Sequence, residues 1–197
     1  MKDVQATVIV NIEGSEEEML NRLQKDARWG IKKAIKEGLA VKESEDYGAF
    51  YEIYKKTIGE LGVKVETLAH VKEHADILFI CSKEDIQIGG AILKVENGIP
   101  KLTRAASLKE YRNLQPNNLL YWQCILWSRN KGFSRLDLGG WQINARGQLE
   151  GVNKFKERWG EVVYYNKEYP FHIALGRKAV RKFSFFWWLN NKIRGRK

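Results

Sequence analysis

The most informative segment of the sequence is LDLGGWQINARGQLEGVNKFKERWG, residues Leu136–Gly160. Alternating apolar residues lead into the pair Gly139-Gly140, and a polar loop separates this pair from an amphipathic run that carries Phe155-Lys156. Paired glycines after a strand permit positive φ values and let another molecule approach the backbone closely. A lysine a few residues beyond such a break can face an anion or a developing oxyanion. The stretch therefore predicts a strand, a glycine break and a helix that presents Lys156.

The composition suits one folded domain. The chain has 197 residues, of which 44% are hydrophobic and seven are Trp, enough for a substantial core. Cys81 and Cys124 each lie in an apolar run, which favours buried free thiols in a reducing cytoplasm. The first apolar segment, Val4–Ile12, is short and lacks a basic flank, so we expect no signal peptide. No run approaches the roughly 20 apolar residues of a membrane span.

The net charge of +10 is concentrated at the C-terminus. Residues 177–197 contain eight Lys or Arg and no Asp or Glu, whereas the rest of the chain holds 26 basic and 24 acidic residues. Cations around the aromatic cluster of 183–188 suit an anionic membrane surface or an RNA backbone. The alternative is a C-terminal helix that docks its aromatic side chains on the core. We therefore expect one domain over 1–176 and a basic aromatic helix or tail over Arg177–Lys197, with peripheral contact at the inner membrane surface.

The periodicity of apolar residues predicts an α/β order of elements. We expect a strand at 5–12, one helix from the Ser15 capping box to about 38, a strand at 39–42, helices at 46–61 and 65–73, strands at 77–81, 86–95 and 99–105, a buried helix at 117–129, a strand at 134–138, a helix at about 149–159, strands at 162–165 and 171–175, and a C-terminal helix. Such an order predicts a mixed, mostly antiparallel sheet with helices on both faces.

Three segments in this order carry a family resemblance. The first is ATVIVNIEGSEEEMLNRLQKDARWGIKKAIKEGLAV, the second YWQCILWSRNKGFSRLDLGG and the third GVNKFKERWG. They resemble the second lobe of the Fem family of peptidoglycan interpeptide-bridge enzymes, which belongs to the GNAT acyltransferase superfamily. The matching positions are Ser15–Glu18, Arg28, Ile31–Ala34 and Gly38–Val41, then Asp137–Gly140, then Gly151, Phe155, Lys156, Trp159 and Gly160. The resemblance covers roughly residues 5–175 and implies a GNAT-like acyltransferase fold.

The resemblance implies transfer of an amino acid from an aminoacyl-tRNA to an amine of a cell-wall precursor. Lys156 would then stabilise the tetrahedral intermediate or contact the RNA terminus, and Phe155 would pack beside the terminal adenosine. Asp137 is a second catalytic candidate, although an acid at a strand end is more often a turn or cap carboxylate. Candidates for substrate or tRNA binding are Gly139, Gly140, Trp141, Arg28 and Lys32. The last two belong to a basic stripe that is either a solvated helix face or part of an RNA track.

Three departures qualify what the resemblance implies. The segment Tyr111–Asn117, where GNAT proteins hold acetyl-CoA, has no glycine, and Pro116 has no N–H to donate, so we expect no cofactor. Glu60 and Glu66 stand where Fem enzymes that bind UDP-linked precursors carry arginines, so the acceptor is expected to differ. The chain also matches one lobe of a two-lobed enzyme. It is therefore a stand-alone relative, a homodimer that recreates the pair, or a fragment.

Other readings of the sequence remain open. His70, Glu73 and His74 match the H-x-x-E-H zinc pattern, but only His172 or a scattered acid offers a third ligand, so we expect no metal site. The enzymatic alternative is an N-acyltransferase that uses acyl-CoA or an acyl carrier. The non-enzymatic alternative is a lobe that only binds RNA or membrane through its basic tail.

Overall fold

A seven-stranded mixed sheet organises the computed structural model, which describes residues 2–60 and 64–168. The strands are β1 Lys2–Asn11, β2 Leu39–Ser44, β3 Ile77–Lys83, β4 Ile86–Glu96, β5 Ile99–Ser107, β6 Arg135–Trp141 and β7 Glu161–Glu168. The helices are α1 Glu16–Arg22, α2 Lys25–Lys36, α3 Tyr47–Glu60, α4 Leu68–Glu73, the 3-10 helix η1 Lys109–Leu114, α5 Pro116–Asn130 and α6 Gln148–Glu157. Residues 6–163 form one compact unit. The described residues 2–5 and 164–168 belong to a second unit, into which β1 and β7 continue.

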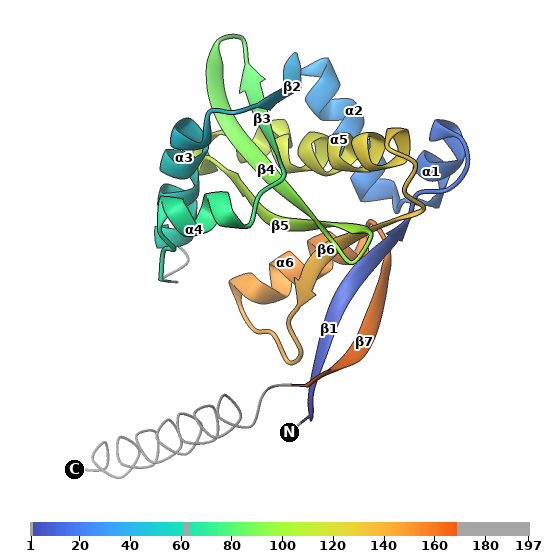
Figure 1. Ribbon diagram of the computed structural model, residues 1–197. Coiled ribbons are helices and arrows are strands. Elements are labelled where there is room, and N and C mark those ends of the chain that lie inside the picture. The colour runs from blue at the N-terminus through green and yellow to red at the C-terminus, as the bar shows by residue number, and fades with distance from the viewer. Residues whose placement is uncertain (1, 61–63, 169–197) are drawn as a thin grey trace, which may run out of the picture. The chain divides into compact units, whose positions relative to one another are not determined.

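The strands lie in the order β2-β3-β4-β5-β6-β1-β7 (Figure 1). Strands β2 to β5 pair antiparallel in sequence order, and β1 pairs antiparallel with β6. Between β5 and β6 the pairing is parallel, with Lys101 opposite Asp137. A parallel pair needs a crossover, which α5 supplies. The predicted α/β class and the mixed, mostly antiparallel sheet are therefore confirmed.

Helices cover both faces of the sheet because its strands alternate apolar residues (Figure 1). In β3, Leu78 and Ile80 pack with residues of α3 and α4, such as Phe50 and Val71. The intervening Phe79 joins a larger cluster on the opposite face, where α1, α2 and α5 supply most of the apolar side chains. Helix α5 is buried on most of its circumference, as its nearly continuous apolar sequence predicts.

The local signals that proved right are turn and cap motifs. The capping box at Ser15 is complete, since the Ser15 hydroxyl accepts from Glu18 N and the Glu18 carboxylate accepts from Ser15 N. Asp46 accepts a hydrogen bond from Ala49 N at the start of α3. Asn97 and Gly98 both have positive φ, as a tight hairpin turn between β4 and β5 requires.

Two predicted elements differ in the structure. The single helix expected from Ser15 to about residue 38 is two helices, because Leu23 and Gln24 are extended and Leu23 turns into the core. The helix expected at 65–73 begins only after Thr67, whose hydroxyl caps His70 N. In both places a buried or capping residue determines the helix limits.

Some predictions lie outside the described residues. These are the strand at 171–175, the domain boundary at 176 and the basic aromatic segment Arg177–Lys197. Among the helices of the described part of the chain, none combines the length and apolar character needed to cross a bilayer.

Candidate functional site

The glycine pair of β6 forms a bulge inside the strand. The register with β1 shifts between Thr7, opposite Gly140, and Ile9, opposite Asp137, so β6 carries one extra residue there. Gly139 has φ +75°, and a Cβ at this position would lie 2.8 Å from the Leu102 carbonyl oxygen of β5. Both observations require glycine. The predicted glycine break is therefore a bulge, and β6 continues through it to Trp141.

Lys156 projects from α6 toward this bulge. Its Nζ donates a hydrogen bond to the Gly140 carbonyl oxygen at 2.9 Å. Burial lowers the pKa of Lys156 to about 8, the negative charge of Asp137 opposes that decrease, and the positive charge of Lys101 adds to it. Since the side chain is half-buried and its Nζ is held at a strand end, the amine does not project into bulk solvent. At neutral pH it is therefore a positioned and mostly protonated amine.

Asp137 anchors the bulge. Its Oδ1 accepts hydrogen bonds from Gly139 N at 2.7 Å and from the hydroxyl of Thr7, a residue of β1 that is 6% exposed. The carboxylate thus holds the backbone in the positive-φ turn and supplies a negative charge near Lys156. This arrangement matches the turn-and-cap interpretation of Asp137 better than that of a free base, because one oxygen already accepts two hydrogen bonds.

The loop after β6 is fastened to α6 by side chains. Asn153, which is 5% exposed, accepts from Gln142 N at 2.9 Å and donates to Gln142 O at 2.8 Å. Trp141 Nε1 donates to Glu157 Oε1 at 2.6 Å. Sequence analysis missed Asn153, although its position three residues before Lys156 places both on one helix face. Together these bonds fix where the Gly140 carbonyl meets Lys156.

Replacing Asn153 tests this fastening. Asn153→Ala removes both hydrogen bonds to Gln142, each of which contributes on the order of 0.5–1.5 kcal/mol. We expect the free energy of unfolding in urea to fall by about 1–3 kcal/mol. Lys154→Ala, on the same helix but exposed, is the matched control and should change it by less than about 0.5 kcal/mol. Equal losses in the two variants would mean that Asn153 does not hold the loop.

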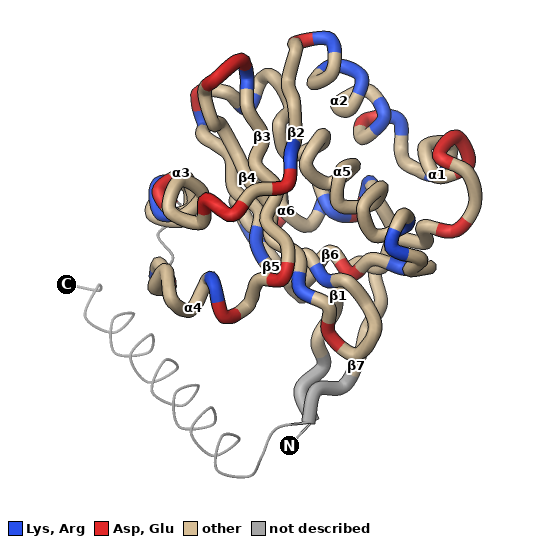
Figure 2. The backbone as a smooth tube through the Cα atoms, turned by 45° about the horizontal axis from the view of Figure 1, so that its top comes forward, with Lys and Arg blue, Asp and Glu red and all other residues tan. Residues whose placement is uncertain are grey.

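The remaining candidates from the sequence, Phe155, Arg28 and Lys32, do not all lie at the β6 bulge. Phe155 is half-buried and packs edge-on against Tyr121 of α5, with ring centroids 5.0 Å apart. Arg28 donates to the main-chain carbonyls of Asn21 and Leu23 at the end of α1. Lys32 is exposed on α2, where Figure 2 shows several Lys and Arg residues along the helix. In the described ranges 2–60 and 64–168, neither Arg28 nor Lys32 bonds to Lys156 or Asp137.

The two acids that stand where Fem enzymes carry arginines are engaged within the chain. Glu66 forms two hydrogen bonds with Arg104, at 2.8 and 2.9 Å, and Glu60 lies 3.7 Å from Arg112. The segment Tyr111–Asn117, where GNAT proteins hold acetyl-CoA, comprises the end of η1 and the start of α5. Between the two helices, Gln115 has φ 65° and precedes Pro116 in the first turn of α5. Side chains here bond locally, with Asn118 Nδ2 donating to Gln115 Oε1 at 2.8 Å.

Neither cysteine is placed for covalent chemistry. Cys81 and Cys124 are free and buried, as predicted. Burial raises the pKa of the Cys81 thiol to about 12 and raises that of Cys124 as well. Because the thiolate is the nucleophilic form, both behave as core residues.

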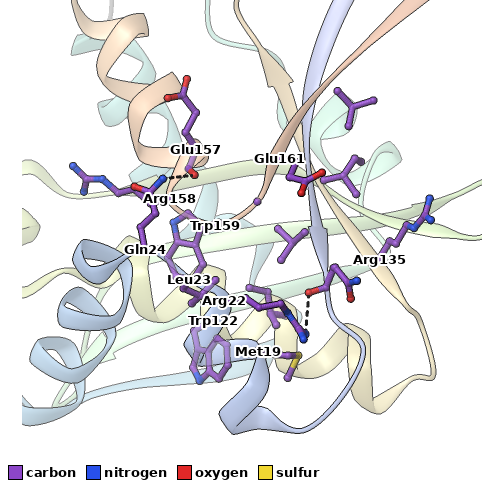
Figure 3. Close-up of a pocket in the computed structure, with 16 residues that line it drawn as sticks. Met19, Arg22, Leu23, Gln24, Trp122, Arg135, Glu157, Arg158, Trp159 and Glu161 are labelled. Carbon is purple, nitrogen blue, oxygen red and sulfur yellow. Dashed lines mark hydrogen bonds between the residues drawn. The ribbon is translucent and has the colours of Figure 1, made fainter.

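A separate cavity lies between β1, α1, α5 and the turn from α6 to β7 (Figure 3). Its volume is about 520 Å³, and apolar residues such as Met19, Trp122 and Trp159 share its lining with charged residues that include Arg22. Glu157 also lines it, and Figure 3 shows the Gln24 side chain donating to the Glu157 carbonyl, at 3.2 Å. Lys156 is not among the lining residues, so the cavity and the β6 bulge are two distinct features that share α6.

Comparison with solved structures identifies the fold. The crystal structure of FemX matches with a TM-score of 0.69 and 18% identity over 81% of this chain and 59% of that chain. The C-terminal domain (DUF2156) of a protein designated a lysylphosphatidylglycerol synthetase, from Agrobacterium fabrum, matches with a TM-score of 0.61 and 8% identity over 84% of this chain and 60% of that chain.

A third match is the GCN5-related glucosamine N-acetyltransferase region of a fungal multi-domain β-N-acetylglucosaminidase, with a TM-score of 0.57 and 10% identity over 84% of this chain and 20% of that chain. No protein-family model and no curated protein sequence matches the chain. The chain spans about three-fifths of the length of the first two matched structures. At these identities the likeness concerns the fold, and the expectation from the sequence is confirmed at that level: this chain has the Fem/GNAT-like acyltransferase fold.

Proposed function

We propose that this chain is an N-acyltransferase that moves an aminoacyl group from an aminoacyl-tRNA to an amine of a peptidoglycan precursor or a related acceptor. The observation that carries the proposal is the half-buried ammonium of Lys156, fixed on the Gly140 carbonyl beside the β6 bulge. The fold supports it, since matched structures include FemX and an N-acetyltransferase region.

The proposed reaction is aminolysis of an ester. The acceptor nitrogen attacks the ester carbonyl, a C–N bond forms, and the carbonyl oxygen becomes an oxyanion. Collapse of this intermediate breaks the C–O bond to the terminal ribose, and the proton lost by the amine neutralises the departing alkoxide. Lys156 is the proposed oxyanion donor, because preorganised cationic donors stabilise developing negative charge. The ester is already activated, so no protein nucleophile is required.

The surrounding candidates take supporting roles in this proposal. Asp137 is a positioning residue, since its charge favours the ammonium form of Lys156 and its Oδ1 holds the bulge. Gly139, Gly140 and Trp141 form the strand end that the donor would approach, and Phe155 would pack beside the terminal adenosine. On α2, Lys32 is freer than Arg28 to meet an RNA phosphate, because Arg28 already bonds to two main-chain carbonyls.

The acceptor is proposed at the level of chemical class. FemX and a lysylphosphatidylglycerol synthetase domain share the fold, so amine-bearing cell-wall precursors and phosphatidylglycerol are the two acceptors to compare. We favour the amine, as the resemblance to the Fem family implies, and we place the reaction at the cytoplasmic face of the inner membrane. Pairing of two copies as a homodimer would supply a second lobe.

A direct assay separates the proposed function from its alternatives. The purified chain is incubated with total tRNA charged with radiolabelled amino acids and with each acceptor. Transfer of label to the amine acceptor is the expected result. Transfer only from acyl-CoA would establish the other acyltransferase class. If RNA or vesicle binding is lost on deletion of Arg177–Lys197 and no donor is consumed, the chain is a binding lobe and the proposal is wrong.

A further inference from the structure

Helix α4, which together with α3 covers one face of the sheet (Figure 1), carries a histidine pair. His70 is in the middle of α4, His74 follows its last residue, and their ring centroids are 4.3 Å apart. Val71 between them is fully buried in the cluster that α3 and α4 form with the sheet, so the short helix is firmly seated. Two imidazoles one helical turn apart can bind the same metal ion.

Glu73 supplies the third ligand. Its Oε2 lies 3.6 Å from His70 Nδ1, and His70, Glu73 and His74 each offer a ligand atom within 4.8 Å of the others. Zinc bonds of about 2.0–2.1 Å in a tetrahedron place neighbouring ligand atoms about 3.3 Å apart. The Glu73 side chain is 72% exposed, so it is free to close the remaining distance. From the sequence, a third ligand was sought in His172 or a scattered acid, whereas the structure offers one from within the motif.

Each imidazole also has its other ring nitrogen next to an oxygen acceptor. His74 Nδ1 lies 3.0 Å from the His70 carbonyl oxygen, and His70 Nε2 lies 3.2 Å from Glu66 Oε1. Metal-binding histidines characteristically donate their second N–H to a carbonyl or carboxylate, which fixes the tautomer and the ring orientation. This pattern leaves His70 Nδ1 and His74 Nε2 as the metal-facing atoms.

Glu66 is itself held in place. Arg104, whose side chain is 9% exposed, donates to both of its carboxylate oxygens, and the Tyr54 hydroxyl donates to Oε2 at 2.8 Å. The carboxylate that orients His70 is therefore part of a rigid network rather than a mobile surface group. This support distinguishes the cluster from a chance pair of exposed histidines.

We propose that His70, Glu73 and His74 bind one Zn²⁺ ion per chain, with Glu66 and the His70 carbonyl orienting the two rings. Imidazole and carboxylate ligands suit zinc and similar divalent transition metals. The ion would link the first turn of α4 to its end and so stabilise a six-residue helix, a length that is marginal by itself. This site does not depend on the acyl-transfer proposal, and its three protein ligands would leave the fourth position of a tetrahedral ion to water.

Calorimetric titration of the chelator-treated full chain with Zn²⁺ tests the site. We expect saturable binding of one ion per chain in the micromolar range and a rise in Tm at saturating zinc. His74→Gln and Glu73→Gln should each weaken binding at least tenfold and remove the rise in Tm. The matched control is His172→Gln, which removes the one other histidine of the chain and should leave both readouts unchanged.

Three results would overturn the proposal. One is the lack of saturable zinc uptake by the wild-type chain. Another is wild-type affinity in both His74→Gln and Glu73→Gln, and the third is loss of binding in His172→Gln. Circular dichroism checks that each variant folds, and Glu73→Gln alters only an exposed carboxylate, so at least one informative variant is folded.

Discussion

Lys156→Ala is expected to lower the rate of aminoacyl transfer by about 10²–10³ while the chain stays folded. The estimate is the effect of removing one preorganised oxyanion donor, about 3–4 kcal/mol of transition-state stabilisation. The fold should survive because Gly140 is exposed, so water can solvate the carbonyl oxygen that loses its bond to Lys156. The measurement is single-turnover transfer from charged tRNA, with circular dichroism to check the fold.

The pH profile separates an electrostatic role of Lys156 from a structural one. With a pKa of about 8, Lys156 loses its positive charge as the pH rises through that value. A transfer rate that depends on the ammonium should therefore decline above about pH 8. Lys156→Arg is the matched variant, since arginine keeps its charge far above this range. It should retain part of the activity and lose the alkaline decline.

Opposite results would reject the assignment. If the transfer rate rises through pH 8 in the wild-type chain but not in Lys156→Ala, Lys156 acts as a general base and not as a positively charged oxyanion donor. Full activity in Lys156→Ala would remove it from the chemistry and leave the fold as the sole support for acyl transfer. Binding of charged tRNA, measured in parallel by filter retention, distinguishes loss of chemistry from loss of the donor.

Much of the fold could be predicted because its signals are local. The capping box at Ser15, the turn at Asn97-Gly98 and the apolar helix α5 each lie within a few residues, and each appears in the structure. The division of the first helix at Leu23 could not be predicted, because Leu23 also fits the helical spacing. Its position is fixed by burial against distant parts of the chain and by Arg28, which donates to its carbonyl.

The sequence could name candidate residues for the site but not the hydrogen bonds between them. A lysine at a helix surface is usually solvated, whereas Lys156 bonds to the Gly140 carbonyl and burial lowers its pKa, with the charge of Asp137 opposing the decrease. Those contacts join residues far apart in the sequence, so no periodicity reports them. The same holds for Asn153 and for the pairing of Glu66 with Arg104, where tertiary geometry decides which polar residue is engaged.

Gly139→Ala is expected to destabilise the chain by about 2–5 kcal/mol. A residue other than glycine in the left-handed region costs roughly 1–2 kcal/mol, and forcing a group into a packed site costs about 1–3 kcal/mol. Both costs apply, since Gly139 has φ +75° and its added Cβ would lie 2.8 Å from the Leu102 carbonyl oxygen. Relief of that contact requires β5 and β6 to separate near Lys101 and Asp137, where they pair.

Gly140→Ala is the matched control from the neighbouring position. The nearest atom to a Cβ there is Gln142 Nε2 at 4.0 Å, and Gly140 is not among the residues with positive φ. We expect a change within about 0.5 kcal/mol in urea unfolding. Because Lys156 bonds to the Gly140 carbonyl, Gly139→Ala should also slow transfer, and Gly140→Ala serves as the control for stability alone. Similar losses of stability in both variants would contradict this prediction. They would show that the positive φ of Gly139 does not hold the Gly140 carbonyl, to which Lys156 bonds, in its position.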